Sequence, residues 1–253
     1  MAVFSSHLEN ALLKHILGIA QYSPPTNLKL GLSTTTPLEN GSGITEPTGN
    51  YARTTITFDS SSNGIISNNS IINFPQATSN WGTIKYTFIA DQNNNLLCFS
   101  AITSQNIESG DVVTFPTGSI QVQFDLSFMS SYLANALLNM VFKGISYSQP
   151  DLYLALSTQE IVTAITEPNI SAGYSRFHLS SNDFTVTDGI ATSERSFLFG
   201  PASDDWGKVY GCAIMDDEDG GNILLYFNFD EYVDAVLGTS IVFDEGDFII
   251  TLD

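Results

Sequence analysis

Basic residues are scarce in this sequence. The chain of 253 residues contains 8 Lys and Arg against 27 Asp and Glu, which gives a formal net charge of −19. Binding to nucleic acid depends on contacts between Lys or Arg and phosphates, and an anionic membrane surface repels an acidic chain. We therefore expect neither a nucleic-acid partner nor a membrane partner.

Long apolar runs and reactive motifs are also missing. No apolar stretch reaches the ~20 residues that a membrane-spanning helix needs. The opening residues, MAVFSSHLEN, lack a basic segment followed by an apolar core, so we expect no secretory signal. The sequence contains no G-x-S-x-G, H-E-x-x-H or C-x-x-C motif and no glycine-rich phosphate loop. We expect a protein that is not an enzyme, and we nominate no catalytic, cofactor-binding or metal-binding residue and no cofactor.

Cysteine and histidine are rare as well. The only cysteines, Cys98 and Cys212, do not occupy equivalent places in the repeat described below, so we expect two buried free thiols rather than a disulfide. The three histidines are His7, His15 and His178. No stretch of the chain gathers one of them with a nucleophile and an orienting acid in a recognisable pattern.

Uncharged polar and β-forming residues fill the places that charges leave. Charged residues make up 14% of the chain, and Phe and Tyr number 17 and 10. Ser, Thr and Asn combined with Phe, Tyr, Ile and Val favour sheets over helices. The composition therefore predicts a mainly β protein.

One long phrase occurs twice. ATSNWGTIKYTFIAD at 77–91 returns as ASDDWGKVYGCAIMD at 202–216, and other segments recur in the same order. These pairs are LENALL with LANALL (8–13, 133–138), LKLGLST with LYLALST (28–34, 152–158), TEP with TEP (45–47, 166–168), NYAR with GYSR (50–53, 173–176) and NLLCF with NILLY (95–99, 222–226). Matching order with gaps confined to expected loops indicates tandem duplication of a module of about 125 residues.

The duplication predicts two domains, repeat 1 (1–125) and repeat 2 (126–253), with no Pro/Gly/Ser-rich linker between them. We therefore expect the two repeats to pack closely. Repeat 1 carries four basic and eight acidic residues, whereas repeat 2 carries four and nineteen. Because the centres of protein interfaces are depleted in charge, we expect repeat 1 to be the more embedded half of an assembly. The acidic repeat 2 suits solvent or a basic partner.

Each repeat is expected to begin with an amphipathic helix and to continue as strands. Apolar residues recur at helical spacing at Leu8, Leu12, Ile16 and Ile19, and at Leu133, Leu137, Val141 and Ile145. Gly18 and Gly144 then mark helix ends. Period-two alternation and hairpin turns predict about six or seven strands per repeat, arranged as a β-sandwich or jelly-roll-like unit with the helix against it.

Two local features invite a functional interpretation. Arg53 and Arg176 recur at equivalent positions, and Glu46 and Glu167 recur before them. The simpler interpretation is an Arg–Glu ion pair that tethers a loop in each repeat, and the alternative is contact with a ligand carboxylate or a partner.

The second feature is the acidic segment MDDEDGGN at 215–222. Its carboxylates, from Asp216, Asp217, Glu218 and Asp219, are a possible set of oxygen ligands for a cation such as Ca²⁺. The spacing is not that of an EF-hand, so we favour a solvated acidic hairpin turn.

The chain resembles a family of small virion proteins of tailed bacteriophages that are labelled as tail fibre proteins. The resemblance rests on LENALLKHILG, YSPPTNLKLGLST, TEPTGNYAR, NFPQATSNWGTIKYTFIAD, NLLCFSAI and SGDVVTFPTGSIQVQFD in repeat 1. Repeat 2 follows it more loosely, and family members usually have a single unit. The resemblance implies a structural component of the virion without catalysis, and it carries over no functional residues.

A fibre shaft requires fibrous repeats or long heptads, which this sequence lacks. We therefore favour a capsid decoration or cement protein bound to the major capsid protein lattice. The alternative is a tail fibre or tail-tip appendage that binds a carbohydrate receptor. In either case we expect partners among the virion proteins, a homo-oligomer, and assembly in the host cytoplasm into the capsid surface or tail.

Overall fold

One helix stands at the start of each repeat. The computed structural model describes residues 2–252 and contains α1 (Ser6–Ile16) and α2 (Ser131–Lys143) at equivalent places. Ser5 and Ser130 cap these helices, and each hydroxyl accepts a hydrogen bond from the main-chain N–H three residues on. The two predicted amphipathic helices are therefore present.

Both helices end before the last residues assigned to them from the sequence. Gly144 lies in the left-handed region with φ of 69° and caps α2, and Gly18, with φ of 70°, follows the last turn of α1. Glycine adopts this conformation without steric cost, so it ends the helix. The predicted punctuation is confirmed, but the inclusion of Ile19 and Ile145 in the helices is wrong.

Repeat 1 is built on one antiparallel sheet of five strands in the order β1-β7-β6-β2-β3, with two-stranded ribbons β4-β9 and β5-β8 beside it. Its strands are β1 (Val3–Phe4), β2 (Lys29–Ser33), β3 (Thr54–Thr55), β4 (Ile65–Ser67), β5 (Ile72–Asn73), β6 (Gly82–Ala90), β7 (Leu96–Ile107), β8 (Thr114–Phe115) and β9 (Gln121–Gln123).

Repeat 2 follows the same plan, with the sheet β11-β10-β15-β16, the three-stranded β12-β13-β18 and the ribbon β14-β17. Its strands are β10 (Leu152–Ser157), β11 (Phe177–Leu179), β12 (Phe184–Thr187), β13 (Ile190–Ser193), β14 (Phe197–Phe199), β15 (Gly207–Met215), β16 (Ile223–Ala235), β17 (Ile241–Phe243) and β18 (Ile249–Ile250), with short 3-10 turns at Ile170–Ala172 and Ser181–Asp183. The chain is mainly β and consists of two repeated units, as the sequence predicts.

The number of strands exceeds the prediction of six or seven. Within residues 2–252 each repeat contains nine, because several strands span only two to four residues. Alternation needs more residues than that to show in a sequence. In the segment ARTTITF at 52–58, for example, only Thr54–Thr55 forms a strand.

The twice-written phrase forms the first strand of the longest hairpin in each repeat. Trp81 and Trp206 are buried before β6 and β15, and the glycine after each has positive φ, 80° and 77°. At the far end, the Asp91 carboxylate accepts hydrogen bonds from the main-chain N–H groups of Asn93 and Asn95 and so holds the turn. A buried Trp, a Gly with positive φ and, at the far end, a turn held by Asp thus explain why the phrase is kept in both repeats.

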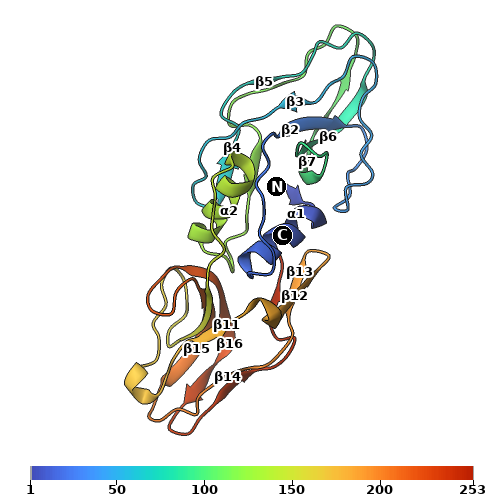
Figure 1. Cartoon of the computed structure of the whole chain (residues 1–253). Coiled ribbons are helices and arrows are strands. Elements are labelled where there is room, and N and C mark those ends of the chain that lie inside the picture. The colour runs from blue at the N-terminus through green and yellow to red at the C-terminus, as the bar shows by residue number, and fades with distance from the viewer. Residues whose placement is uncertain (1, 253) are drawn as a thin grey trace.

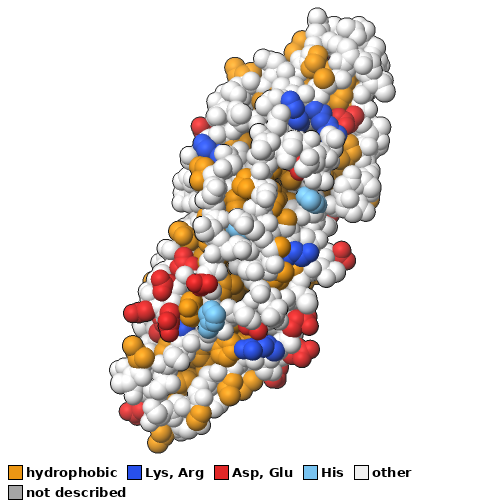
Figure 2. All heavy atoms as spheres, in the orientation of Figure 1, with side chains coloured by type: hydrophobic (Ala, Val, Ile, Leu, Met, Phe, Trp, Pro, Cys, Tyr) orange, Lys and Arg blue, Asp and Glu red, His pale blue; other side chains and the backbone are white. Residues whose placement is uncertain are grey.

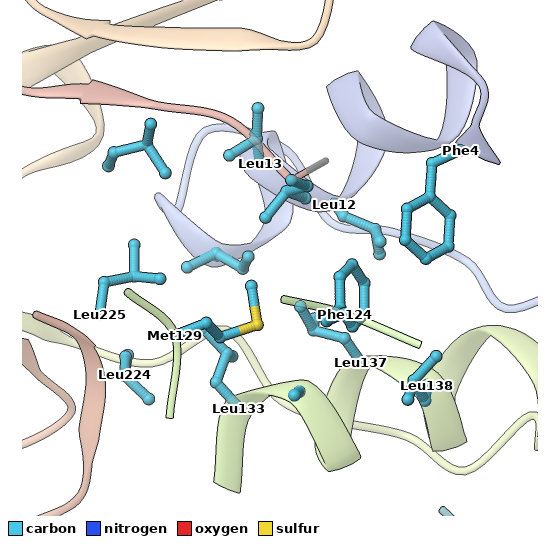
Figure 3. Packing of buried hydrophobic residues seen from close by; sticks show 14 of the residues in the cluster. Phe4, Leu12, Leu13, Phe124, Met129, Leu133, Leu137, Leu138, Leu224 and Leu225 are labelled. Atoms are coloured by element: carbon cyan, nitrogen blue, oxygen red, sulfur yellow. The ribbon is translucent and has the colours of Figure 1, made fainter. Parts of the chain in front are cut away.

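The repeats lie end to end and share one interior (Figure 1). A single cluster of buried apolar residues continues from the sheet of repeat 1 through both helices into repeat 2. Figure 3 shows Leu12 and Leu13 of α1 in the same space as Leu133 and Leu137 of α2. The expected close packing of the repeats is confirmed, while the boundary at residues 125 and 126 stays a prediction.

Cys98 and Cys212 are both buried and free, as expected. Burial raises the pKa of the Cys98 thiol to about 12. Across residues 2–252, no helix combines the length and the apolar character needed to cross a membrane.

Candidate functional site

Each repeat carries a pocket at the same place, beside the N-terminus of its helix. The pocket of repeat 1 has a volume of about 470 Å³ and that of repeat 2 about 660 Å³. Five corresponding positions hold the same residue in both linings, namely Ser5, Ile44, Glu46, Arg53 and Asn95 in repeat 1 with Ser130, Ile165, Glu167, Arg176 and Asn222 in repeat 2. We name these the paired pockets and take them as the candidate site.

An ion pair lies in each pocket. Arg53 Nη2 is 2.7 Å from Glu46 Oε1, and Arg176 Nη2 is 2.6 Å from Glu167 Oε1. In both pairs Nε of the guanidinium also donates to the carboxylate, which makes the contact bidentate. The tether interpretation of the recurrent Arg and Glu is confirmed in both repeats.

A tyrosine accompanies the ion pair in each repeat, and its hydroxyl group is hydrogen-bonded to the neighbouring main chain. The Tyr174 hydroxyl donates to Glu167 Oε2 at 2.8 Å and accepts from the Leu156 N–H at 2.9 Å. The Tyr51 hydroxyl accepts from the Leu32 N–H at 2.8 Å. Burial raises the pKa of both phenols far above the ordinary tyrosine value, so they stay protonated and hold their hydrogen bonds across the physiological pH range.

In repeat 2 the same arginine binds the acidic turn. Arg176 Nη1 donates to the carbonyl oxygen of Asp217 at 2.5 Å and to that of Gly220 at 2.9 Å. The Asp216 carboxylate accepts hydrogen bonds from the main chain and the side chain of Asn222. A guanidinium thus supplies the positive charge at this turn, whose residues 217–222 are exposed. No group of three or more metal-ligating side chains occurs among the described residues.

The two pockets differ in their floors. In repeat 1 the Phe88 ring lies against Gly31, its cross-strand partner, and the Arg53 guanidinium carbon is 4.8 Å from the ring centroid. In repeat 2 the corresponding cross-strand pair is Ala155 and Ala213. Phe88 lines the pocket of repeat 1, whereas neither alanine lines that of repeat 2.

The three histidines lie in different places. His7 lines the pocket of repeat 1, and His178 on β11 contacts Tyr153 with ring centroids 5.0 Å apart. His15 is buried between the main chains of Tyr147, 2.9 Å from Nε2, and Tyr22, whose N–H lies 3.2 Å from Nδ1. The structure does not bring the three side chains together into one site.

Sequence reasoning identified the Arg and Glu of the paired pockets but missed the apolar residues. Ile44 and Ile165 line the pockets two residues before the recurrent Glu, and the shared sequence ITEP at 44–47 and 165–168 marks them. The Gly31 and Phe88 contact was also missed, since it joins residues far apart in the sequence.

Comparison with known proteins identifies the relatives of both repeats. The family model described as podophage GP4 fiber I protein gp80 matches residues 3–123 and matches again over residues 128–251. No curated protein matches the chain significantly. Because the two matches cover nearly all of the sequence, the chain belongs to the podophage GP4 fiber I protein gp80 family and contains two tandem copies of the family's module.

Proposed function

We propose that this phage virion structural protein is a building unit of a fibre-type appendage and acts through its surfaces rather than through reactive groups. The observation that carries the proposal is the match of both repeats to one phage fibre family. The paired pockets agree with a non-enzymatic role, because their arginines are bound to carboxylates and carbonyls of the chain itself. Repetition of one module along a long axis also suits an appendage (Figure 1).

The surface charge suggests how the unit is oriented among other virion proteins. Figure 2 shows acidic side chains gathered over repeat 2 and few over repeat 1 in this view. Desolvating charged groups is costly, so the low-charge repeat 1 is the better face for burial against neighbours. Repeat 2 would then point to solvent or to a basic partner.

Capsid decoration is the second candidate. It is favoured by the compact β modules, since within residues 2–252 the helices are those of 11 and 13 residues and neither is long enough for a coiled-coil shaft. The two functions differ in location and copy number. A decoration protein covers the head in many copies, whereas an appendage protein occurs in few copies at one end of the particle.

Antibody labelling of intact particles in the electron microscope, combined with quantitative mass spectrometry of purified virions, tests the proposal. We expect label on a tail-associated appendage and a copy number far below that of the major capsid protein. Label distributed over the head at a copy number comparable to the capsid protein would favour decoration instead. Absence from purified particles would refute both functions.

A further inference from the structure

A hairpin turn of each repeat, which we call its tip, contacts the other repeat. In repeat 1 a two-residue turn, Asn63-Gly64, joins Ser62 to Ile65, and in repeat 2 the turn Asp188-Gly189 joins β12 to β13. All four turn residues have positive φ, between 50° and 79°, as a type I′ hairpin turn requires. NG and DG occupy equivalent places in the two repeats, so each repeat presents the same tip.

Each tip is bound by the helix of the other repeat. The Gly64 N–H donates to Asn135 Oδ1 in α2 at 3.0 Å, and the Gly189 N–H donates to Asn10 Oδ1 in α1 at 3.0 Å. Asn10 and Asn135 are the same residue of the module, the Asn of LENALL and LANALL. The tip of each unit therefore contacts the helix of the other unit. An interface in which both units use the same residues in this reciprocal way is isologous, that is, two-fold symmetric.

The packing around these hydrogen bonds repeats the same exchange. Helix α1 contacts β12 and β13 of repeat 2, and α2 contacts β4 and β9 of repeat 1. Figure 3 shows leucines of both helices in the shared interior. The equivalent leucines of this cluster are at most 1% exposed: Leu8, Leu12 and Leu13 in α1, and Leu133, Leu137 and Leu138 in α2. The apolar part of the joint is therefore as symmetric as its polar part.

Some contacts at the joint are not duplicated. His15 reaches the Tyr147 carbonyl from α1, whereas Met140 stands at the corresponding position of α2. Likewise, the contact between the rings of Phe58 and Phe142 of α2, whose centroids are 5.0 Å apart, is made on one side of the joint. The elements that contact each other reciprocally, namely the two tips and the two helices, are nevertheless present in both repeats.

We propose that this joint is a self-complementary binding surface whose partner is a second copy of the same module. The chain then corresponds to a two-fold dimer of modules whose subunits have become covalently linked. The connection at 125–128 keeps the modules at high local concentration but does not hold them together, because the tips, helices and shared interior do. The inference concerns assembly of the module and does not depend on where the protein sits in the virion.

Cleavage of the connection in the folded chain tests the proposal. A protease recognition sequence flanked by Gly–Ser residues is inserted between Ser127 and Phe128, and the purified full-length protein is cut after folding. We expect the two fragments to elute together at the volume of the uncut chain at about micromolar concentration, the usual range for a specific protein complex. Fragments that separate under native conditions would overturn the proposal.

Reciprocal substitutions then test the symmetry of the joint in the cut protein. Asn10→Ala and Asn135→Ala each remove the acceptor of one glycine N–H and should each weaken fragment association about tenfold, which corresponds to about 1.4 kcal/mol. Asn93→Ala, in the exposed hairpin turn of repeat 1, is the matched control and should leave association unchanged. An effect of only one interface substitution, or an equal effect of the control, would contradict a self-complementary joint.

An uncut variant gives an independent result if cutting proves incomplete. A chain with about ten Gly–Ser residues added at the same point loses little stability, because loop-closure entropy grows slowly with length. We expect small-angle X-ray scattering to give an unchanged radius of gyration. An expanded particle with two independently tumbling modules would refute the proposal.

Discussion

At the scale of single residues, the paired pockets show one ion pair in two environments. The Arg176 side chain is 5% exposed and bridges Glu167 and two turn carbonyls, whereas Arg53 is 25% exposed. Removing one partner of a buried, hydrogen-bonded pair leaves the other charge uncompensated, and an exposed pair contributes little. Burial therefore sets how much each arginine stabilises the fold.

Replacement of each arginine by methionine measures this difference. We predict that Arg176→Met lowers the free energy of unfolding by about 3 kcal/mol. The matched Arg53→Met should cost about 1 kcal/mol, because Arg53 is more exposed and contacts its turn through the Asn94 side chain at 3.3 Å rather than through two carbonyls. Urea denaturation of the two variants and the parent chain gives both values. Equal losses would contradict the role assigned to the acidic turn and to burial.

The buried His15 makes stability depend on pH. Burial lowers the pKa of His15, although its hydrogen bond to the Tyr147 carbonyl raises it in part. The folded state thus binds the proton less readily than the unfolded state. The contribution of neutral His15 to the free energy of unfolding is therefore fully present above the unfolded pKa of about 6.5 and is lost as the pH falls below it.

His15→Met tests this pH dependence, since repeat 2 already accommodates Met140 at the equivalent position. We predict that the variant is less stable near neutral pH because two hydrogen bonds are lost. From about pH 7.5 to about pH 5.5, however, its free energy of unfolding should fall less than that of the parent. Denaturant titrations at both pH values provide the comparison, and parallel slopes would show that His15 does not titrate with folding.

At the scale of elements, cross-strand partners differ between the repeats in a compensated way. Gly31 leaves room for the Phe88 ring, and a Cβ at that position would overlap ring atoms. At the equivalent place repeat 2 combines Ala155 with Ala213. At this place the sheet of repeat 1 therefore pairs a large side chain with a glycine, whereas the sheet of repeat 2 pairs two small side chains.

A double-mutant cycle tests this compensation. Gly31→Ala alone should destabilise the protein by about 2 kcal/mol through overpacking. Phe88→Ala alone should cost about 3 kcal/mol because it leaves a cavity. The double variant, which copies repeat 2, is predicted to be no less stable than Phe88→Ala alone. Additive losses in thermal unfolding would show that the two positions do not interact.

The repeat made most of the fold predictable. Helical spacing, the Trp-Gly phrase and the Arg–Glu pair each appear twice, so chance resemblance could be discounted. The two-residue strands β5 and β8 were not predictable, because tertiary pairing and not local pattern creates them. The pocket floor at Phe88 and the contact of Asn10 with Gly189 were missed for the same reason, although the NG and DG turns at matching places carried a signal.

At the scale of the whole molecule, duplication has produced one structural unit rather than two independent domains. The tips of both repeats are bound by the opposite helices, and the buried apolar cluster continues through the joint. Disruption of one repeat therefore exposes apolar surface of the other. We expect the two modules to lose their structure together.

Differential scanning calorimetry of the intact chain tests this cooperativity most directly. We predict a single reversible transition whose calorimetric enthalpy equals its van't Hoff enthalpy, the signature of all-or-none unfolding. Two resolved transitions, or a calorimetric enthalpy about twice the van't Hoff value, would contradict the view that two copies of one module form a single structural unit.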